Sequence, residues 1–272
     1  MLTADYFKVR VHLTISIKKN EALFMYNPAL MNTKPFDLVI FDCDGVLVES
    51  EALACQIYVQ LFAEYGHPLD YTETLHKFYG VTLTNRLKVS AQELGWAPPD
   101  EFVPLFNERL LALSERELLP VPHIYELIES INVPMCVASN GSRDEIVFRL
   151  KVAGLTERFG SAIFSGTEVP HPKPAPDVYL AAAQSFNIHP SHCVVVEDSI
   201  LGVTAGVRAG MTVYGHATFN SAESLRAVGA IPFANMLELK AMLNNHVTLS
   251  GSEGSLLRKD ETLRSLEIAP SE

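Results

Sequence analysis

The sequence lacks the features that mark a membrane-spanning, secreted or nucleic-acid-binding protein. No apolar run approaches the roughly 20 residues that a membrane-spanning helix needs. The first residues show no basic stretch followed by an apolar segment and a cleavage site, so no signal peptide is expected. Acidic residues outnumber basic ones, 32 against 21, and the net charge of −11 argues against nucleic acid or an anionic membrane as a partner. We therefore expect a cytoplasmic protein whose partner is a small molecule.

Cysteine is scarce as well. The sequence has 4 cysteines without a CxxC pair, so we expect reduced, mostly buried thiols rather than a disulfide framework. Apolar residues are plentiful by contrast: 48% of the 272 residues are hydrophobic, which is enough for one large domain or two smaller ones. This composition is typical of a globular protein that is a monomer or a small homo-oligomer.

Short apolar runs, several of them rich in β-branched residues, recur along the chain. They cover residues 38–41, 134–139, 161–166, 193–198 and 211–215, and most are separated by segments of helical periodicity. Near-continuous apolar strands that alternate with amphipathic helices are typical of a parallel sheet covered on both faces. The sequence therefore predicts an α/β fold with a parallel sheet.

The alternation of strands and helices breaks between residues 50 and 117, where only helical signals occur. A helical insert after the first strand predicts a separate cap at 50–117, inserted into a core made of 34–49 and 118–245. Residues 1–33 precede the first strand and are predicted to be a mobile N-terminal extension. The polar composition of 246–272 predicts a mobile C-terminal tail.

Reactive or polar residues follow four of the predicted strands or lie in the loops behind them. These residues are Asp42, Asp44, Ser139, Asn140, Lys173, Glu197 and Asp198. Each of them alone fits an ordinary polar loop. Because ligands of an open parallel sheet bind beyond the carboxyl ends of its strands, their common placement indicates one site.

The two aspartates after the first strand fit phosphoryl transfer. Asp42 could attack phosphorus to give an aspartyl-phosphate, and Asp44 could protonate the leaving oxygen and then activate water. Asp42, the main-chain carbonyl of Asp44 and Asp198 could hold Mg²⁺, which would offset the repulsion between a carboxylate and a phosphate dianion. Gly45 would permit a sharp turn and a close approach behind these residues.

The remaining residues of the set could hold the phosphate. Lys173 offers a point charge, and Ser139 and Asn140 offer donors together with nearby main-chain N–H groups. Cys43 lies between the aspartates and could be read as a nucleophile. Strand alternation points it away from them, so we expect a small buried side chain instead.

Four segments carry a resemblance to a known family: "DCDGVLVES", "ASNGS", "HPKPAP" and "VVEDSILGVTAG". They resemble the four ordered motifs of the haloacid dehalogenase-like hydrolase superfamily, and the likeness spans roughly residues 36–245. The resemblance implies a modified Rossmann core, a helical cap after the first motif, and Mg²⁺-dependent hydrolysis through an aspartyl-phosphate. It also implies roles: Asp42 as nucleophile, Asp44 as acid and base, Ser139 and Lys173 as phosphate ligands, and Asp198 with Glu197 at the metal site.

Two features narrow the reaction within this superfamily. The dehalogenases lack the second aspartate of the DxD pair, so Asp44 argues for phosphate chemistry. Members similar to β-phosphoglucomutase carry a cap-hinge histidine twelve residues after the nucleophile, where this sequence has Ala54. A hydrolase is therefore favoured, and the finer resemblance is to bacterial phosphatases of the 6-phosphogluconate phosphatase type. The alternatives are a phosphomutase and a catalytically silent protein that uses the fold for binding.

The expected substrate is a small phosphorylated metabolite, either a sugar phosphate or a phosphorylated sugar acid. Discrimination among such esters is expected from the cap, since the core motifs can hold any phosphate monoester. Arg86 and Lys88, which lie beside "YGVTLT", are the cations predicted to contact the far end of the substrate. The alternative for both is a solvated position on a helix surface.

Overall fold

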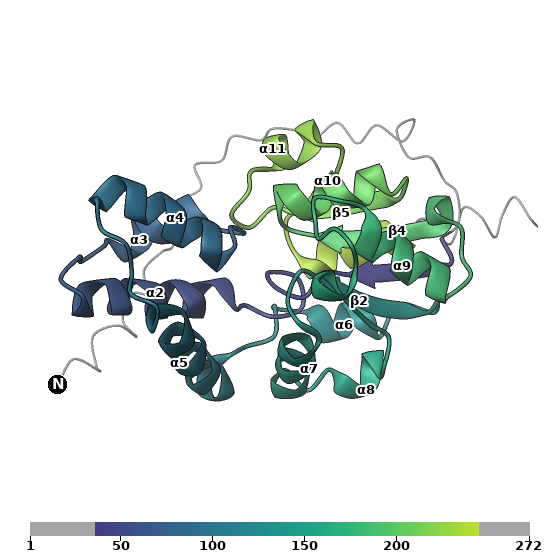
Figure 1. The fold of residues 1–272 in the computed structure, drawn as a ribbon. Helices are drawn as coiled ribbons and strands as arrows, with labels where there is room; N and C mark the ends of the chain where they lie inside the picture. The colour runs from purple at the N-terminus through teal and green to yellow at the C-terminus, as the bar shows by residue number, and fades with distance from the viewer. Residues whose placement is uncertain (1–35, 245–272) are drawn as a thin grey trace, which may run out of the picture. The chain divides into compact units, whose positions relative to one another are not determined.

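The structure, a computed structural model, describes residues 36–244. Its centre is a six-stranded sheet in the order β3-β2-β1-β4-β5-β6, and every neighbouring pair of strands is parallel (Figure 1). The strands are β1 (Leu38–Phe41), β2 (Met135–Ser139), β3 (Ile163–Ser165), β4 (Cys193–Glu197), β5 (Thr212–His216) and β6 (Ile231–Phe233). The predicted α/β fold with a Rossmann-like sheet is confirmed. The expectations for residues 1–33 and 246–272 lie outside the described residues.

Five of the six strands lie where the apolar runs predict them, and β6 is the exception. It has three residues and contains Pro232, which lacks the N–H that a central strand would have to donate. A proline is tolerated here because β6 is the edge strand, bonded only to β5. Local sequence therefore gave no strand signal at this position.

Helices cover both faces of the sheet, which explains why its strands are apolar throughout. Val39 and Phe41 of β1 belong to one buried apolar cluster, and Leu38 and Ile40 belong to the other. The first cluster includes residues of α6 (Ile124–Ile128), α7 (Arg143–Val152), α8 (Thr156–Phe159) and the helical segment 236–244. The second includes residues of α9 (Asp177–Ser185), α10 (Ile200–Arg208) and α11 (Ala222–Ala227).

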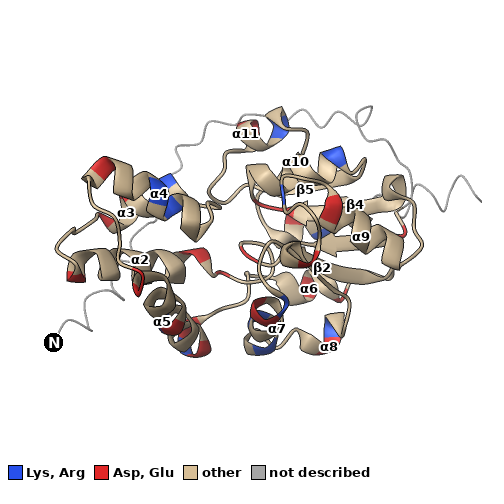
Figure 2. Ribbon diagram, in the orientation of Figure 1, with Lys and Arg blue, Asp and Glu red and all other residues tan. Residues whose placement is uncertain are grey.

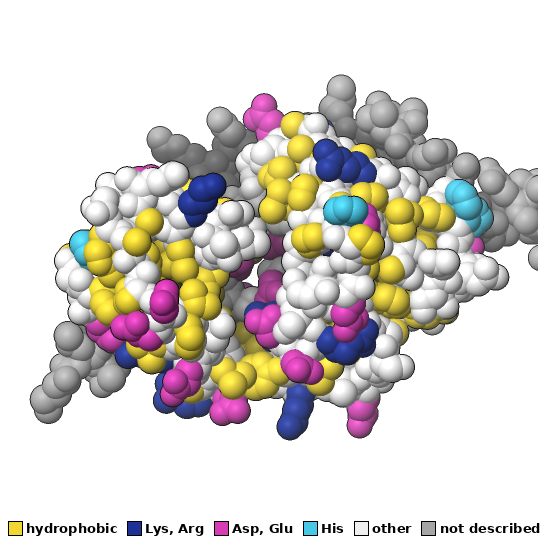
Figure 3. Space-filling model, in the orientation of Figure 1, with side chains coloured by type: hydrophobic (Ala, Val, Ile, Leu, Met, Phe, Trp, Pro, Cys, Tyr) yellow, Lys and Arg dark blue, Asp and Glu magenta, His cyan; other side chains and the backbone are white. Residues whose placement is uncertain are grey.

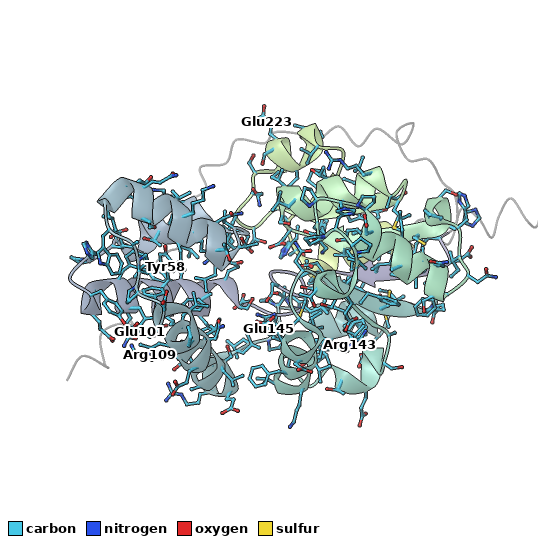
Figure 4. The ribbon with its side chains drawn as sticks, in the orientation of Figure 1. Tyr58, Glu101, Arg109, Arg143, Glu145 and Glu223 are labelled. Carbon is cyan, nitrogen blue, oxygen red and sulfur yellow. The ribbon has the colours of Figure 1, made fainter. Side chains whose placement is uncertain are left out.

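Four helices follow β1 in the sequence within residues 50–117: α2 (Glu51–Glu64), α3 (Tyr71–Phe78), α4 (Leu83–Leu94) and α5 (Phe102–Glu117). Residues 50–117 contain no strand, although their treatment as a separate cap remains a prediction. Tyr58 is fully buried among these helices and donates a hydrogen bond to Ser90 (2.9 Å) (Figure 4). Phe62 packs edge-on against Trp96 and Phe102, so aromatic side chains form the interior of the insert.

All four cysteines are free and buried, as the sequence predicts. Within residues 36–244, none of the helices has the length and apolar character that crossing a bilayer requires.

Candidate active site

The predicted polar residues meet at the carboxyl edge of the sheet. Asp42 and Asp44 lie directly after β1, Ser139 ends β2, Glu197 ends β4, and Lys173 comes from the segment between β3 and α9. Together with Asn140 and Asp198 they line a cavity of about 320 Å³, which opens as a hollow on the face drawn in Figure 3. Figure 2 marks acidic positions on the loops at this edge and at the start of α2.

The chain turns sharply after Asp42. The N–H of Asp42 continues the sheet by donating to Val196 (2.9 Å), and the N–H of Gly45 donates to Val48 (2.8 Å). Gly45 has φ +76°, and a Cβ placed on it would lie only 1.9 Å from Oδ2 of Asp198. Glycine is therefore required here both by the backbone angle and by the close carboxylate. Cys43 is fully buried, and burial raises the pKa of its thiol, as expected of a packing residue.

Lys173 connects the carboxylates of two strand ends. Its Nζ donates to Oδ1 of Asp42 (2.6 Å), to Oε1 of Glu197 (2.8 Å) and to the carbonyl of Ala138 (2.9 Å). Only 4% of its side chain is exposed, and the ammonium also lies 4.7 Å from the centre of the Tyr179 ring. The three N–H groups of the ammonium therefore each donate to one acceptor, and these hydrogen bonds hold Lys173 next to Asp42.

Glu197 has both carboxylate oxygens occupied by donors. Oε1 accepts from Lys173 and from Tyr179 Oη (3.1 Å), while Oε2 accepts from the N–H groups of Asp198 and Ser199 (each 2.8 Å) and from Ser199 Oγ (3.0 Å). Burial alone would raise the pKa of Glu197, but Lys173 and these N–H donors lower it below its ordinary value. Gly202 leaves room for this carboxylate, since a Cβ there would lie 1.6 Å from Oε1. Glu197 is thus placed to hold Lys173 and the loop after β4.

Asp42 and Asp198 are two further buried carboxyl groups that lie close together, and each accepts a side-chain hydrogen bond from a single residue, Lys173 and Tyr79 respectively. Burial raises the pKa of Asp42 to about 7, against the opposing effect of Lys173. Burial also raises the pKa of Asp198 well above its ordinary value, and the carboxylates of Glu197 and Asp42 add to the rise. Tyr79 Oη, from the segment after α3, donates to Oδ2 of Asp198 (2.7 Å). Such crowding favours a bound cation, whose charge would allow both groups to ionise.

The carboxylate oxygens at this point are suitable ligands for a hard divalent metal ion. Ligand atoms of Asp42, Glu197 and Asp198 all lie within 4.8 Å of one another, and all three residues are buried. Carboxylate oxygens are the ligands that Mg²⁺ prefers. Since the oxygens of Glu197 already accept several hydrogen bonds, Asp42 and Asp198 are the side chains best able to bind it.

The residues after β2 link the loops of the site. Ser139 is 2% exposed, and its Oγ accepts from the N–H of Gly141 (3.2 Å). Asn140 uses its amide on the main chain of Lys173: Oδ1 accepts from the N–H (2.9 Å) and Nδ2 donates to the carbonyl (3.2 Å). The Asn140 side chain therefore positions the lysine segment, and its side-chain amide has little left for a ligand.

Asp44 is held by two side chains that the sequence did not predict as its partners. Its Oδ1 accepts from Ser50 Oγ and pairs with Nε of Arg149 (3.2 Å). Arg149 comes from α7 and lines the cavity, as does Glu145 at the start of the same helix (Figure 4). Neither residue was predicted from the sequence; the four-residue spacing of Glu145 and Arg149 could have indicated them, because it puts both on one helix face behind the "ASNGS" loop.

Arg86 and Lys88 are not among the residues that line the cavity. The side chain of Arg86 is 7% exposed, and its guanidinium pairs with Glu51 (2.6 Å) and donates to the carbonyl of Val81 (2.6 Å). Lys88 lies exposed on α4. In their place the insert presents Glu51 and the segment 80–83 to the cavity.

Comparison with known proteins identifies relatives. The family described as haloacid dehalogenase-like hydrolases matches residues 39–216. The chain is 32% identical to a 6-phosphogluconate phosphatase of Escherichia coli over 179 residues, which cover 65% of this chain and 81% of that protein. It is 30% identical to a phosphorylated carbohydrates phosphatase of Thermotoga maritima over 214 residues, 76% of this chain and 98% of the other.

Solved structures agree with these relatives. A haloacid dehalogenase-like protein from Agrobacterium tumefaciens superposes with a TM-score of 0.72 and 31% identity, covering 78% of this chain and 99% of that one. A hydrolase of the same family from Deinococcus radiodurans, with bound phosphate and sodium, gives a TM-score of 0.68 at 36% identity, over 78% of this chain and 96% of that one.

Proposed function

The chain belongs to the haloacid dehalogenase-like hydrolases and is a phosphoric monoester hydrolase, and we propose that it is a Mg²⁺-dependent phosphatase acting on a small phosphorylated metabolite. The observation that carries the proposal is the buried Asp42 carboxylate held 2.6 Å from Lys173, in a cavity that also contains Asp44 and Asp198. The named relatives favour a sugar phosphate or a phosphorylated sugar acid such as 6-phosphogluconate as the substrate.

The reaction would proceed in two steps. In the first, a carboxylate oxygen of Asp42 forms a bond to phosphorus, the bond from phosphorus to the ester oxygen breaks, and Asp44 gives that oxygen a proton. In the second, Asp44 takes a proton from water, the water oxygen attacks phosphorus, and phosphate leaves with Asp42 restored. Lys173 keeps the nucleophile in place, and Ser139 with the neighbouring main-chain N–H groups would bind phosphoryl oxygens.

Mg²⁺ would be held by Asp42, Asp198 and the main-chain carbonyl of Asp44. When bound, a divalent cation supplies positive charge that offsets the repulsion between these carboxylates and a phosphate dianion. Glu197 supports the same site indirectly, because it anchors Lys173 and the N–H groups next to Asp198.

A release assay for inorganic phosphate tests the proposal. The purified full chain with Mg²⁺ would be offered sugar phosphates, 6-phosphogluconate, phosphoglycolate and nucleotides. We expect the highest kcat/KM among the sugar phosphates and phosphorylated sugar acids. An enzyme that releases phosphate from none of these esters, while remaining folded, would contradict the proposed function.

Removal of divalent metal is expected to stop turnover. Without a cation, the carboxyl groups of Asp42, Asp44 and Asp198 would face the phosphate dianion of the substrate. Chelator should therefore abolish phosphate release and added Mg²⁺ should restore it, whereas Ca²⁺ should inhibit because its larger, looser ligand shell misplaces the nucleophile. Undiminished turnover in excess chelator would rule out the metal-dependent reaction.

Gly45→Ala is expected to inactivate the enzyme more than it destabilises it. An added methyl group would lie 1.9 Å from Oδ2 of Asp198 and would displace that carboxylate from the metal site. The left-handed backbone adds about 1–2 kcal/mol of destabilisation. Gly210→Ala is the matched control, since φ is +77° there as well and no atom lies within 4 Å of its added Cβ. Equal losses of activity in the two variants would refute the close-approach argument.

We propose further that the insert selects the substrate. Gly80, Val81, Thr82 and Leu83 line the same cavity as the catalytic loops. Arg86 would contribute through the Glu51 carboxylate that it holds, and Lys88 would contribute only to a substrate that reaches the exposed side of α4. A cytoplasmic monomer or small homo-oligomer fits this function.

A further inference from the structure

Arg149 is a charged side chain at the cavity with a buried nitrogen that has no hydrogen-bond partner. It extends from α7 to the acid/base residue, with its Nε 3.2 Å from Oδ1 of Asp44, and 17% of its side chain is exposed. Its Nη1 atom is buried and has no hydrogen-bond partner, and no other buried side-chain nitrogen or oxygen in residues 36–244 shares that property. An unpaired buried donor costs about 1–3 kcal/mol, more when charged, so its retention calls for a functional explanation.

The unpaired Nη1 lies beside the proposed phosphate loop. A Cβ placed on Gly141 would lie 3.1 Å from Nη1, 3.4 Å from Oε2 of Glu145 and 3.7 Å from Ser139 Oγ. Because Gly141 has no side chain, the guanidinium can lie close to this loop, and Ser139, Gly141 and Arg149 all line the cavity. The guanidinium therefore has an acid/base carboxylate at one nitrogen and, at another, an unpaired N–H group close to the phosphate loop.

We propose that Arg149 is a further active-site residue, which positions Asp44 through Nε and binds an oxygen of the substrate's phosphoryl group through Nη1. The proposal rests on the phosphatase function proposed above. A planar guanidinium suits both tasks at once, because its donors point in fixed directions, so that Nε and Nη1 can serve two different acceptors. The substrate would then supply the acceptor that Nη1 lacks, and its binding would fix Asp44 next to the ester oxygen.

The positioning role predicts a dependence on the leaving group. A sugar phosphate has a poor leaving oxygen that needs the proton of Asp44, whereas the oxygen of p-nitrophenyl phosphate departs with little protonation. Arg149→Met should therefore lower kcat/KM for the best sugar phosphate by about 100-fold and for p-nitrophenyl phosphate by only about 10-fold. The quantity kcat/KM is chosen because it excludes the later hydrolysis of the phosphorylated enzyme.

The binding role predicts weaker inhibition by inorganic phosphate. Loss of a charged hydrogen bond to a phosphate oxygen should raise the inhibition constant of inorganic phosphate by about 10-fold or more in Arg149→Met. The kcat/KM values and the inhibition constant of Arg149→Lys should lie between those of the wild type and Arg149→Met, because lysine keeps the positive charge but lacks the several fixed donors of a guanidinium. Thermal unfolding of each variant shows whether it is folded, and Arg149→Lys serves as the test if Arg149→Met is not.

Arg143→Met is the matched control. Arg143 lies on the same helix, pairs with Glu168 (2.7 Å), is 44% exposed and is absent from the cavity lining (Figure 4). This variant should leave both measurements unchanged. Equal losses on the two esters, or an unchanged inhibition constant for phosphate, would overturn the assignment of Arg149. A wild type that releases phosphate from no ester would instead overturn the proposed function, so the two failures are distinguishable.

Discussion

Asp42→Asn is expected to lower phosphate release by on the order of 10⁴-fold or more while the fold is retained. The amide is nearly the same size as the carboxyl group but is a far poorer nucleophile. Stability should change little, because Lys173 keeps Glu197 and the Ala138 carbonyl as acceptors and a buried carboxyl group with a raised pKa is removed. Release of phosphate from the best ester and thermal unfolding would be measured on the same preparation.

Asp44→Asn serves as the comparison for that variant. Asp44 acts on protons rather than on phosphorus, so its loss should be severe for sugar phosphates and milder for p-nitrophenyl phosphate. Asp42→Asn should be equally inactive on both. Mass spectrometry has to exclude deamidation back to aspartate, and substantial turnover by Asp42→Asn free of deamidation would refute the nucleophile assignment.

The central strands of the sheet could be predicted because they are buried on both faces, which requires apolar residues at nearly every position. β1 and β4 are apolar at each position up to the carboxylates that follow or end them, and this pattern predicted both strands and the place of the site. The sequence patterns of the edge strand β6 and of the helix α3 are weaker. β6 contains a proline, and α3 is eight polar-rich residues with only Thr74 and Phe78 buried.

Contacts between side chains of different helices and loops could not be predicted from the sequence. The contact of Arg86 with a substrate, expected because it lies beside "YGVTLT", stays a prediction, and the sequence gave no sign that its side chain pairs with Glu51 on another helix. Arg149 carried no motif, and its link to Asp44 exists only because α7 packs beside the loop after β1. Local periodicity gives the faces of a helix but not the neighbour that each face meets.

Lys173→Met is expected to abolish turnover and to destabilise the metal-free protein by about 3–5 kcal/mol at neutral pH or above. The substitution would leave Asp42 and Glu197 as buried carboxylates without their shared cation. Urea unfolding in the presence of chelator measures the loss. Lys151→Met is the control, since this lysine is exposed on α7, and it should change the free energy of unfolding by less than about 0.5 kcal/mol.

The loss caused by Lys173→Met should also depend on pH. In the wild type Lys173 helps to hold the pKa of Glu197 below its ordinary value, so the pair stabilises the fold above the unfolded pKa of that carboxyl group. Without the lysine, burial raises the pKa values of Asp42 and Glu197, and ionisation then opposes folding as pH rises through them. The variant should therefore lose less stability at pH 5 than at pH 8, and adding Glu197→Gln should restore part of it. A loss that is independent of pH and unaffected by Glu197→Gln would show that Lys173 stabilises the protein by packing and not by charge.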